Sequence, residues 1–313
     1  MKASSLSVDD YTSILMKGPF GFGKTLAACT FALGGPIWLS YWDKKKPVEL
    51  DHFFRYIIKR PDLLDRIEYD VYGATNANEY LNKLITLTKD CRYTAIINDS
   101  VTMMTSGAVN WSLGFRSSKK NTPDKDKIMP DFDEYKVETS LVTQALDICR
   151  VLPCHVIWTC HPVPSIKIEG SGASMRVTKV NPIVTYGSKV AGIVPGQFSE
   201  IYHFSKQTNW DASSGTSRTR YMVSTDAVGD DFAKSNLGLK GEFEITDRLF
   251  YEVWRERVKL LKEEQHDVKP IEPEPKQYNP FANTTHTTQP PQQNMTPATP
   301  GNKTWNAAKG EWQ

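Results

Sequence analysis

Four short stretches of the chain are apolar and rich in β-branched or aromatic residues: 11–16, 37–41, 93–97 and 155–159. Runs of this length without polar interruption predict strands that are buried on both faces. Helical patterns lie between them, at 25–33, 76–88 and 132–151. Alternating strands and helices predict an α/β fold built on a mostly parallel central sheet.

The pattern changes twice toward the C-terminus. Within 242–264, apolar side chains at Leu249, Val253, Val258 and Leu261 stand among many charges, which predicts an amphipathic helix. We therefore place the folded domain at residues 1–265. Residues 266–313 are rich in Pro, Thr, Asn and Gln and predict a disordered tail. At the end of this tail, two tryptophans stand among polar residues. This pattern favours either a short docking peptide for a partner or an inert solvated end.

Composition narrows the class of protein. The chain has 313 residues, of which 39% are hydrophobic, so it can bury a proper core. Its net charge of +2 favours neither nucleic acid nor a membrane surface, so any site for a polyanion must be local. Five cysteines without a CxxC pair, and no apolar run near the roughly 20 residues of a membrane helix, predict a reduced cytoplasmic protein with no membrane partner.

The strongest motif is at residues 18–25, which match GxxxxGK[ST] between a predicted strand and a predicted helix. Its three glycines permit backbone conformations closed to other residues, so amide N–H groups can converge on phosphate oxygens near the helix N-terminus. Lys24 would reach the β and γ phosphates, and Thr25 would offer a hydroxyl to Mg²⁺. The predicted ATP-binding loop is Gly18, Pro19, Phe20, Gly21, Phe22, Gly23, Lys24 and Thr25.

Two strand ends carry candidate acids for this loop. Asp99 closes the predicted strand 93–97 and is the candidate for holding Mg²⁺, partly through water; the alternative is a simple turn former. Asp43 follows the strand 37–41 and is the candidate for activating the attacking water. Glu49 lies close enough in sequence to compete for that role, and Asp43 could also be a solvated acid beside lysines 44–46.

A fourth strand end carries His161, directly after residues 155–159 and Cys160. A polar side chain at this strand tip could sense the γ-phosphate and move the segment beyond it. The bland alternative is a structural histidine. A zinc site is a further alternative, with Cys154, Cys160 and His161 as ligands, but no second ligand pair accompanies them.

Two segments have a basic, polar composition that predicts loops. Residues 163–188 follow His161 and carry Lys167, Arg176 and Lys179 among Gly, Ser and Pro, which predicts a long mobile loop suited to phosphates of single-stranded DNA. Residues 115–131 form the second. Plain solvated insertions are the alternative for both.

With the P-loop, Asp99-Ser100, the His161 strand tip and the segment 233–239 in this order, residues 10–245 resemble the phage RecA-like ATPases of the Sak single-strand-annealing type. The resemblance implies a RecA-like P-loop core, an acid at the Asp43 position where a glutamate is usual, and a γ-phosphate sensor at His161 where glutamine is common. It also implies DNA contact by the loop after the sensor. Active sites in similar proteins are completed across a subunit interface, for which Lys206, Arg218, Arg220 and Lys234 are candidates.

These observations predict a Mg²⁺-dependent ATPase that forms homo-oligomers on single-stranded DNA and promotes annealing or recombination, in the host cytoplasm if it is phage-encoded. Two alternatives remain open. One is a nucleotide-dependent switch that controls partner binding through the tail without DNA, and the other is a small-molecule kinase.

Overall fold

The computed structural model describes residues 11–43, 46–118, 130–162, 165–169, 176–180, 183, 185, 187–211, 215–226, 233–266, 305–306 and 311–312. The chain divides into two compact units, Met1–Val268 and Lys269–Gln313. In the second unit, β12 (Trp305–Asn306) pairs antiparallel with β13 (Glu311–Trp312). The predictions for the rest of the tail lie outside the described residues.

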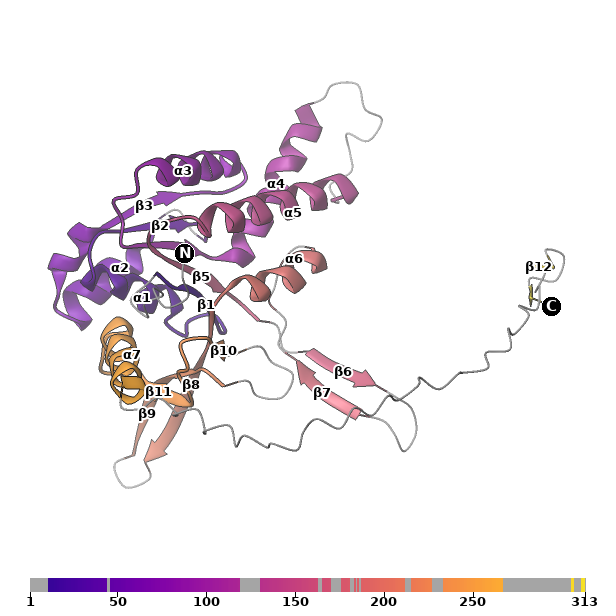
Figure 1. Ribbon diagram of the computed structural model, residues 1–313. Helices are drawn as coiled ribbons and strands as arrows, with labels where there is room; N and C mark the ends of the chain where they lie inside the picture. The colour runs from indigo at the N-terminus through magenta and orange to yellow at the C-terminus, as the bar shows by residue number, and fades with distance from the viewer. Residues whose placement is uncertain are drawn as a thin grey trace, which may run out of the picture. The chain divides into compact units, whose positions relative to one another are not determined.

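A nine-stranded sheet, counted over the described residues, forms the centre of the first unit (Figure 1). Its order is β11-β9-β8-β1-β5-β4-β2-β3, with β10 also paired to β8, and the six neighbours from β3 to β8 are all parallel. The parallel strands are β1 (Ser13–Lys17), β2 (Ile37–Tyr41), β3 (Ile67–Val71), β4 (Ala95–Asp99), β5 (His155–Cys160) and β8 (Glu200–Asp211). The antiparallel ones are β9 (Thr216–Ser224), β10 (Lys234–Ser235) and β11 (Glu242–Glu244).

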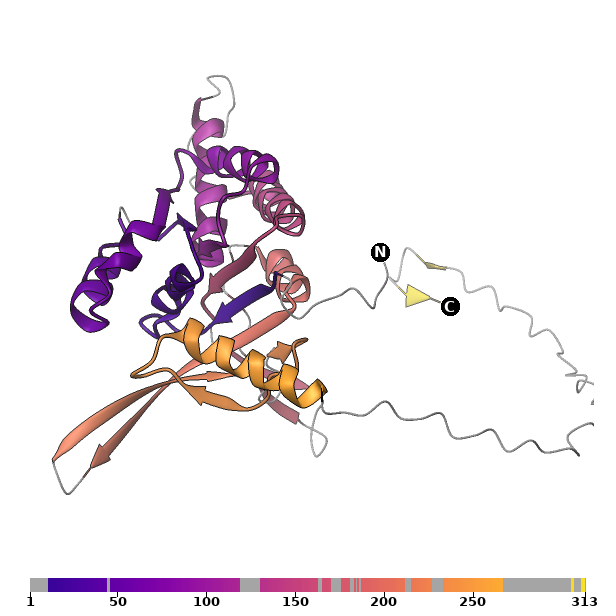
Figure 2. The ribbon, with the colours of Figure 1, turned by 60° about the vertical axis from the view of Figure 1, so that its left-hand side comes forward.

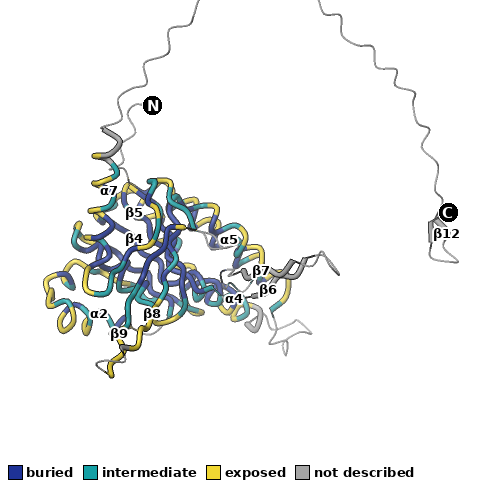
Figure 3. Tube along the Cα trace, turned by 90° about the horizontal axis from the view of Figure 1, so that it is seen from below, coloured by how far each residue is buried: buried dark blue, intermediate teal, exposed yellow. Residues whose placement is uncertain are grey.

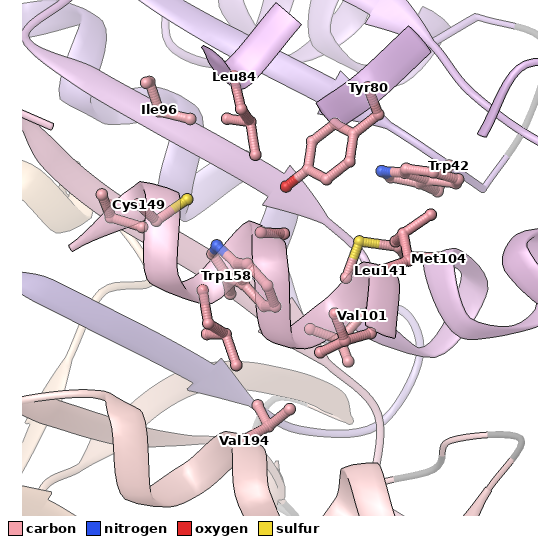
Figure 4. Packing of buried hydrophobic residues seen from close by; sticks show 14 of the residues in the cluster. Trp42, Tyr80, Leu84, Ile96, Val101, Met104, Leu141, Cys149, Trp158 and Val194 are labelled. Atoms are coloured by element: carbon pink, nitrogen blue, oxygen red, sulfur yellow. The ribbon is translucent and has the colours of Figure 1, made fainter. Parts of the chain in front are cut away.

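The central strands are apolar because both of their faces are covered. Alternate residues enter two separate clusters: Leu15 belongs to one, whereas Ile14 and Met16 belong to the other. In β5 the same alternation separates Trp158 from Ile157. Figure 3 shows these strands as a continuous buried interior, and Figure 4 shows Trp158, Tyr80, Leu141 and their neighbours packed in the first cluster.

Helices supply the other half of each cluster. The cluster around Trp158 is completed by α3 (Ala77–Lys89), α4 (Val101–Ser118), α5 (Phe132–Cys149) and α6 (Ser188–Ile193). The cluster around Ile157 is completed by α1 (Lys24–Cys29), α2 (Val48–His52) and α7 (Phe250–His266). Shorter helical turns lie at Thr30–Leu33, Phe53–Ile57, Pro61–Arg66 and Val194–Gln197. The predicted α/β class with a mostly parallel central sheet is confirmed.

Three predicted segments are corrected. Residues 163–188 do not lack strand structure, because β6 (Ser165–Glu169) pairs antiparallel with β7 (Arg176–Val180). In β6 the isoleucines at 166 and 168 alternate with polar residues, which is the period of two of a strand, whereas β7 shows no such alternation. Within 242–264 the helix begins only at Phe250, since Glu242–Glu244 pairs with β9 instead. Of the second basic segment, residues 115–118 end α4, Asp131 caps α5, and 119–129 lie outside the described residues.

Strands β8 and β9 extend beyond the sheet as a two-stranded ribbon (Figure 2). β8 leaves its parallel neighbour β1 after His203, the partner of Lys17. Residues 207–211 and 216–220 then pair with each other and, within the described part of the chain, with no third strand. Trp210, near the turn of this ribbon, is 67% exposed.

None of the helices that the structure describes is long and apolar enough to cross a membrane.

Candidate nucleotide site

The segment between β1 and α1 has the backbone that a phosphate-binding loop needs. Gly21 and Gly23 have φ of 74° and 80°, in the left-handed region that favours glycine, and Gly23 is the N-cap of α1. Gly18 is required for a different reason. A Cβ there would lie 2.7 Å from the carbonyl oxygen of Phe204 on β8, so a side chain has no room.

Lys24 is folded back onto this loop. Its Nζ donates to the carbonyl oxygens of Gly18 (2.6 Å) and Pro19 (2.8 Å) and lies 3.1 Å from Nδ1 of His161. Burial lowers the pKa of Lys24 to about 8, while the nearby Cys160, Asp99 and Asp43 act in the opposite direction. A buried ammonium held by carbonyl dipoles is a group that an anion would bind strongly, because its water has already been removed.

Asp99 joins the loop to the sheet. The hydroxyl of Thr25 donates to Asp99 Oδ2 at 2.8 Å, and the hydroxyl of Thr159 on β5 donates to Oδ1. Burial raises the pKa of Asp99, and the two hydroxyls together with the charge of Lys24 oppose this rise. The pair of oxygen donors, one hydroxyl and one carboxylate, fits the preference of Mg²⁺ for oxygen ligands shared with phosphate and water.

His161 lies on the other side of Lys24. Its backbone N–H donates to the Thr102 hydroxyl (3.2 Å) at the start of α4, and its ring stacks on Phe20 with centroids 3.6 Å apart and planes inclined by 19°. Because Lys24 can only donate, Nδ1 of His161 accepts. The P-loop, the strand-end acid and the strand-tip histidine therefore meet at the carboxyl edge of β1, β4 and β5.

The two acids after β2 are in different situations. Asp43 is half-buried and acts electrostatically on both Lys24 and Asp99. The residue before it, Trp42, donates its backbone N–H to the Asp99 carbonyl oxygen at 2.7 Å, which fixes this strand end against the site. Glu49 accepts a hydrogen bond from the Tyr41 hydroxyl at 2.7 Å, so it anchors α2 to β2.

The hairpin β6–β7 begins directly after the histidine. Pro162 forms an isolated antiparallel bridge with Ile183, which is buried, and this bridge ties the base of the hairpin to the core beside His161. In the register of the hairpin, Glu169 is opposite Arg176 and Ile166 is opposite Lys179. Positions 167 and 176 belong to one face and position 179 to the other.

The four candidates for a contribution across a subunit interface lie on β8, β9 and β10. Arg218 pairs with Asp247 (3.1 Å) and Arg220 with Glu244 (2.9 Å from Nε). Lys234 is opposite Ile201, near the amino end of β8. Lys206 follows Phe204 closely and lies 6.0 Å from the centre of the Tyr221 ring.

The zinc alternative is wrong on geometry. Cys154 precedes β5 and Cys160 ends it, so the strand places the two thiols about 20 Å apart at roughly 3.3 Å per residue. Over the described ranges, no group of three His, Cys, Asp or Glu side chains could hold a metal ion. A magnesium site is compatible with this, since two protein oxygens suffice when phosphates and water supply the remainder.

Three contributors to the site escaped the sequence interpretation: Thr159, Thr102 and the stacking ring of Phe20. Thr159 had a usable signal, because it is a polar residue near the end of a strand whose interior is apolar. The contacts of Thr102 and Phe20 depend on how α4 and the P-loop meet β5.

No protein-family model matches this chain. No curated protein matches it either. Among solved structures, it is similar to a KaiC-like protein, PH0186, from the hyperthermophilic archaeon Pyrococcus horikoshii OT3, with 14% sequence identity and a TM-score of 0.39. That similarity covers 75% of this chain and 89% of the archaeal one.

Proposed function

We propose that this protein binds ATP with Mg²⁺ and hydrolyses it, as a RecA-like ATPase. The observation that carries this proposal is the convergence of Lys24, Thr25 and Asp99 on the mouth of one P-loop, joined by the 2.8 Å hydrogen bond from Thr25 to Asp99. P-loop ATPases require this set: a lysine for the β and γ phosphates, and a hydroxyl and a carboxylate for the metal.

Each residue then has a defined task. The amides of residues 18–24 bind phosphate oxygens, Lys24 leaves its carbonyl partners to bind the γ-phosphate side, and Thr25 and Asp99 hold the metal. When bound, Mg²⁺ neutralises negative charge on the β and γ phosphates. Thr159 keeps the Asp99 carboxylate in one orientation through its hydrogen bond.

We assign activation of the attacking water to Asp43. Its electrostatic influence reaches Lys24 and Asp99, whereas the carboxylate of Glu49 is engaged by Tyr41. A general base must lie within reach of the water that it deprotonates, and the end of β2 is adjacent to the Asp99 strand in the sheet.

We further propose that the protein acts on single-stranded DNA, in annealing or recombination, and that it is phage-encoded and works in the host cytoplasm. Support comes from the position of the β6–β7 hairpin, which carries Lys167, Arg176 and Lys179 directly beyond His161. Bound nucleotide would thus change the conformation of the hairpin and raise its affinity for DNA. By thermodynamic reciprocity, bound DNA would tighten nucleotide binding by the same factor. Five free cysteines are compatible with a reducing compartment.

For the homo-oligomer we propose Lys206 as the residue that reaches a neighbouring subunit's nucleotide. Arg218 and Arg220 already pair with acids, and Lys234 lies toward the amino end of β8, whereas the P-loop follows the carboxyl end of β1. Lys206 has a ring contact with Tyr221 and, within the described residues, no acid within ion-pair distance.

The test is the ATP hydrolysis rate of the full chain with and without single-stranded and duplex DNA. We expect Mg²⁺-dependent hydrolysis that single-stranded DNA stimulates. The variant in which Lys167, Arg176 and Lys179 are alanine should bind single-stranded DNA more weakly, and its salt slope should be smaller by roughly 0.7 for each phosphate that is no longer neutralised. Lys259→Ala, an exposed change on α7, is the matched control.

Hydrolysis without DNA binding would contradict the recombination proposal and favour a nucleotide-dependent switch acting through the tail. Phosphoryl transfer to a small molecule, in place of water, would favour a kinase.

A further inference from the structure

His161 has a contact that an ordinary strand-tip residue lacks. Its ring lies between Phe20 and Lys24, with Nδ1 3.1 Å from the ammonium nitrogen and the ring plane stacked on that of Phe20. Only 7% of the residue is exposed. His161 therefore holds Lys24, the lysine proposed to bind phosphate. The γ-phosphate of a bound triphosphate would lie next to this same histidine.

The neighbours of this ring determine its charge. Lys24 faces the ring from α1. Among the described residues, the other groups in contact with His161 are neutral: the Phe20 ring, the Gly18 backbone and, at the backbone N–H of His161, the Thr102 hydroxyl. Burial and the charge of Lys24 lower the pKa of His161 to about 4, while a backbone contact with Gly18 acts in the opposite direction. At neutral pH the site thus contains a neutral imidazole that accepts from Lys24.

Nucleotide binding would change both sides of this contact. The Lys24 ammonium is needed at the β and γ phosphates, so it must leave Nδ1. His161 then loses its donor and the repulsion of a cation, and gains an anion close by. Phe20 stabilises the charged form further, because a cation over an aromatic face is attracted to it.

We propose that His161 takes a proton from solvent when a nucleoside triphosphate binds, and that the imidazolium donates a hydrogen bond to the γ-phosphate. The proposal rests on the proposed nucleotide binding and adds a charge change to it. A nucleoside diphosphate lacks the γ-phosphate, so it would leave His161 neutral. The histidine would then distinguish triphosphate from diphosphate by charge as well as by shape.

The sign of the pH dependence follows from linkage. With triphosphate bound, the pKa of His161 is higher than its value of about 4 beside Lys24. Proton uptake is therefore greatest between those two pKa values, and triphosphate affinity falls across that interval as pH rises and is constant above the higher pKa.

The experiment is titration calorimetry of the full chain with the Mg²⁺ complex of a non-hydrolysable ATP analogue, in buffers of different ionisation enthalpy. The slope of the measured enthalpy against the buffer enthalpy gives the protons taken up. Comparison with His161→Gln at one pH cancels protons that belong to the nucleotide or to other groups. We expect wild type to take up about half a proton more than the variant near pH 6. ADP should show no such difference.

The matched control is His155→Gln, a change of the half-buried histidine at the other end of β5, which should leave the uptake at the wild-type value. Analogue binding with equal uptake in wild type and His161→Gln would overturn the charge change and leave the nucleotide site intact. No analogue binding by wild type would instead contradict the proposed function. If His161→Gln does not fold, wild-type affinity measured from about pH 5 to 8 replaces it: a fall with rising pH for the triphosphate but not for ADP supports the proposal, and parallel curves overturn it.

Discussion

The two ends of β5 each have a histidine, half-buried His155 at the amino end and buried His161 directly after the carboxyl end, and the pKa of both is lowered to about 4. At the amino end, burial and the charge of Arg255 lower the pKa of His155, whose Nδ1 accepts from the Thr12 backbone N–H at 3.1 Å. Aromatic rings of Phe31 and Trp254 pack around it. At the carboxyl end, His161 contacts a lysine that nucleotide binding would remove.

The comparison shows that a lowered pKa does not identify a functional histidine. His155 is held by backbone and by rings of the core, groups that have no reason to move, so it stabilises the fold. His161 contacts the Lys24 side chain, which would move to the phosphates when a nucleotide binds. The carboxyl end of the sheet should thus control activity, and the amino end should control stability.

Lys24→Ala should produce the largest effect at the carboxyl end. It removes the charge placed against the β and γ phosphates, so we expect kcat/KM for ATP to fall by about 10³-fold, the upper range for losing one such donor. The melting temperature should change little. Near-normal hydrolysis by the folded variant would end the P-loop assignment.

Asp99→Ala should reduce turnover at limiting Mg²⁺ by about 10²- to 10³-fold, with a much weaker loss of nucleotide binding, because the carboxylate positions the metal and its water. Hydrolysis rates across a Mg²⁺ series, beside nucleotide affinity, separate the two effects. Unchanged turnover at low Mg²⁺ would remove Asp99 from the site.

Asp43→Asn should preserve ATP binding and slow hydrolysis by roughly 10²-fold, the usual scale for a positioned general base. Glu49→Gln is the matched comparison, because it keeps an acceptor for the Tyr41 hydroxyl and should have only a small effect. If the two variants exchanged these results in single-turnover kinetics, the base would be Glu49.

His155→Gln should have the smallest effect, and on stability alone. The folded protein keeps His155 neutral while the unfolded chain protonates near pH 6.5, so stability is present above that pH and decreases as pH falls toward 4. We expect this histidine to account for about 1–2 kcal/mol of that decrease in the free energy of unfolding, a figure that includes a discount for partial exposure of the ring. Urea unfolding of wild type and variant at several pH values measures it. A change in kcat at neutral pH would contradict the division between the two ends.

The sequence predicts the parts of the molecule whose physics is local. The tight turn at residues 18–25 is predicted correctly because its glycines and the start of α1 are close together in the sequence, and β2 is predicted correctly because both of its faces are apolar. β3 escapes prediction because it is an edge strand with only partial burial, and its sequence, Ile-Glu-Tyr-Asp-Val, carries two acids. α4 escapes prediction because Ser, Thr, Met and Gly dilute its helical pattern.

The candidate site is predictable only as separate pieces. Each strand end suggests one polar residue, and the parallel order implies that they share an edge. Nothing local indicates that Lys24 contacts His161, or that Tyr41 engages Glu49, since those contacts depend on the twist of the sheet and on where α2 packs. The strand pattern within 165–180 is too weak to distinguish a hairpin from a loop, because Gly, Ser and Pro surround it.

The close approach of Gly18 to Phe204 has a mechanical consequence. Phe204 lies at the root of the β8–β9 ribbon, whose free part extends about 20 Å at roughly 3.3 Å per residue. A tilt of a few degrees about that root would carry the tip through about 1 Å, as rigid-lever geometry requires for a strand of this length. The lever also operates in reverse. A force on the exposed tip, near Trp210, would be transmitted to Gly18, where the close contact with Phe204 leaves no room for movement.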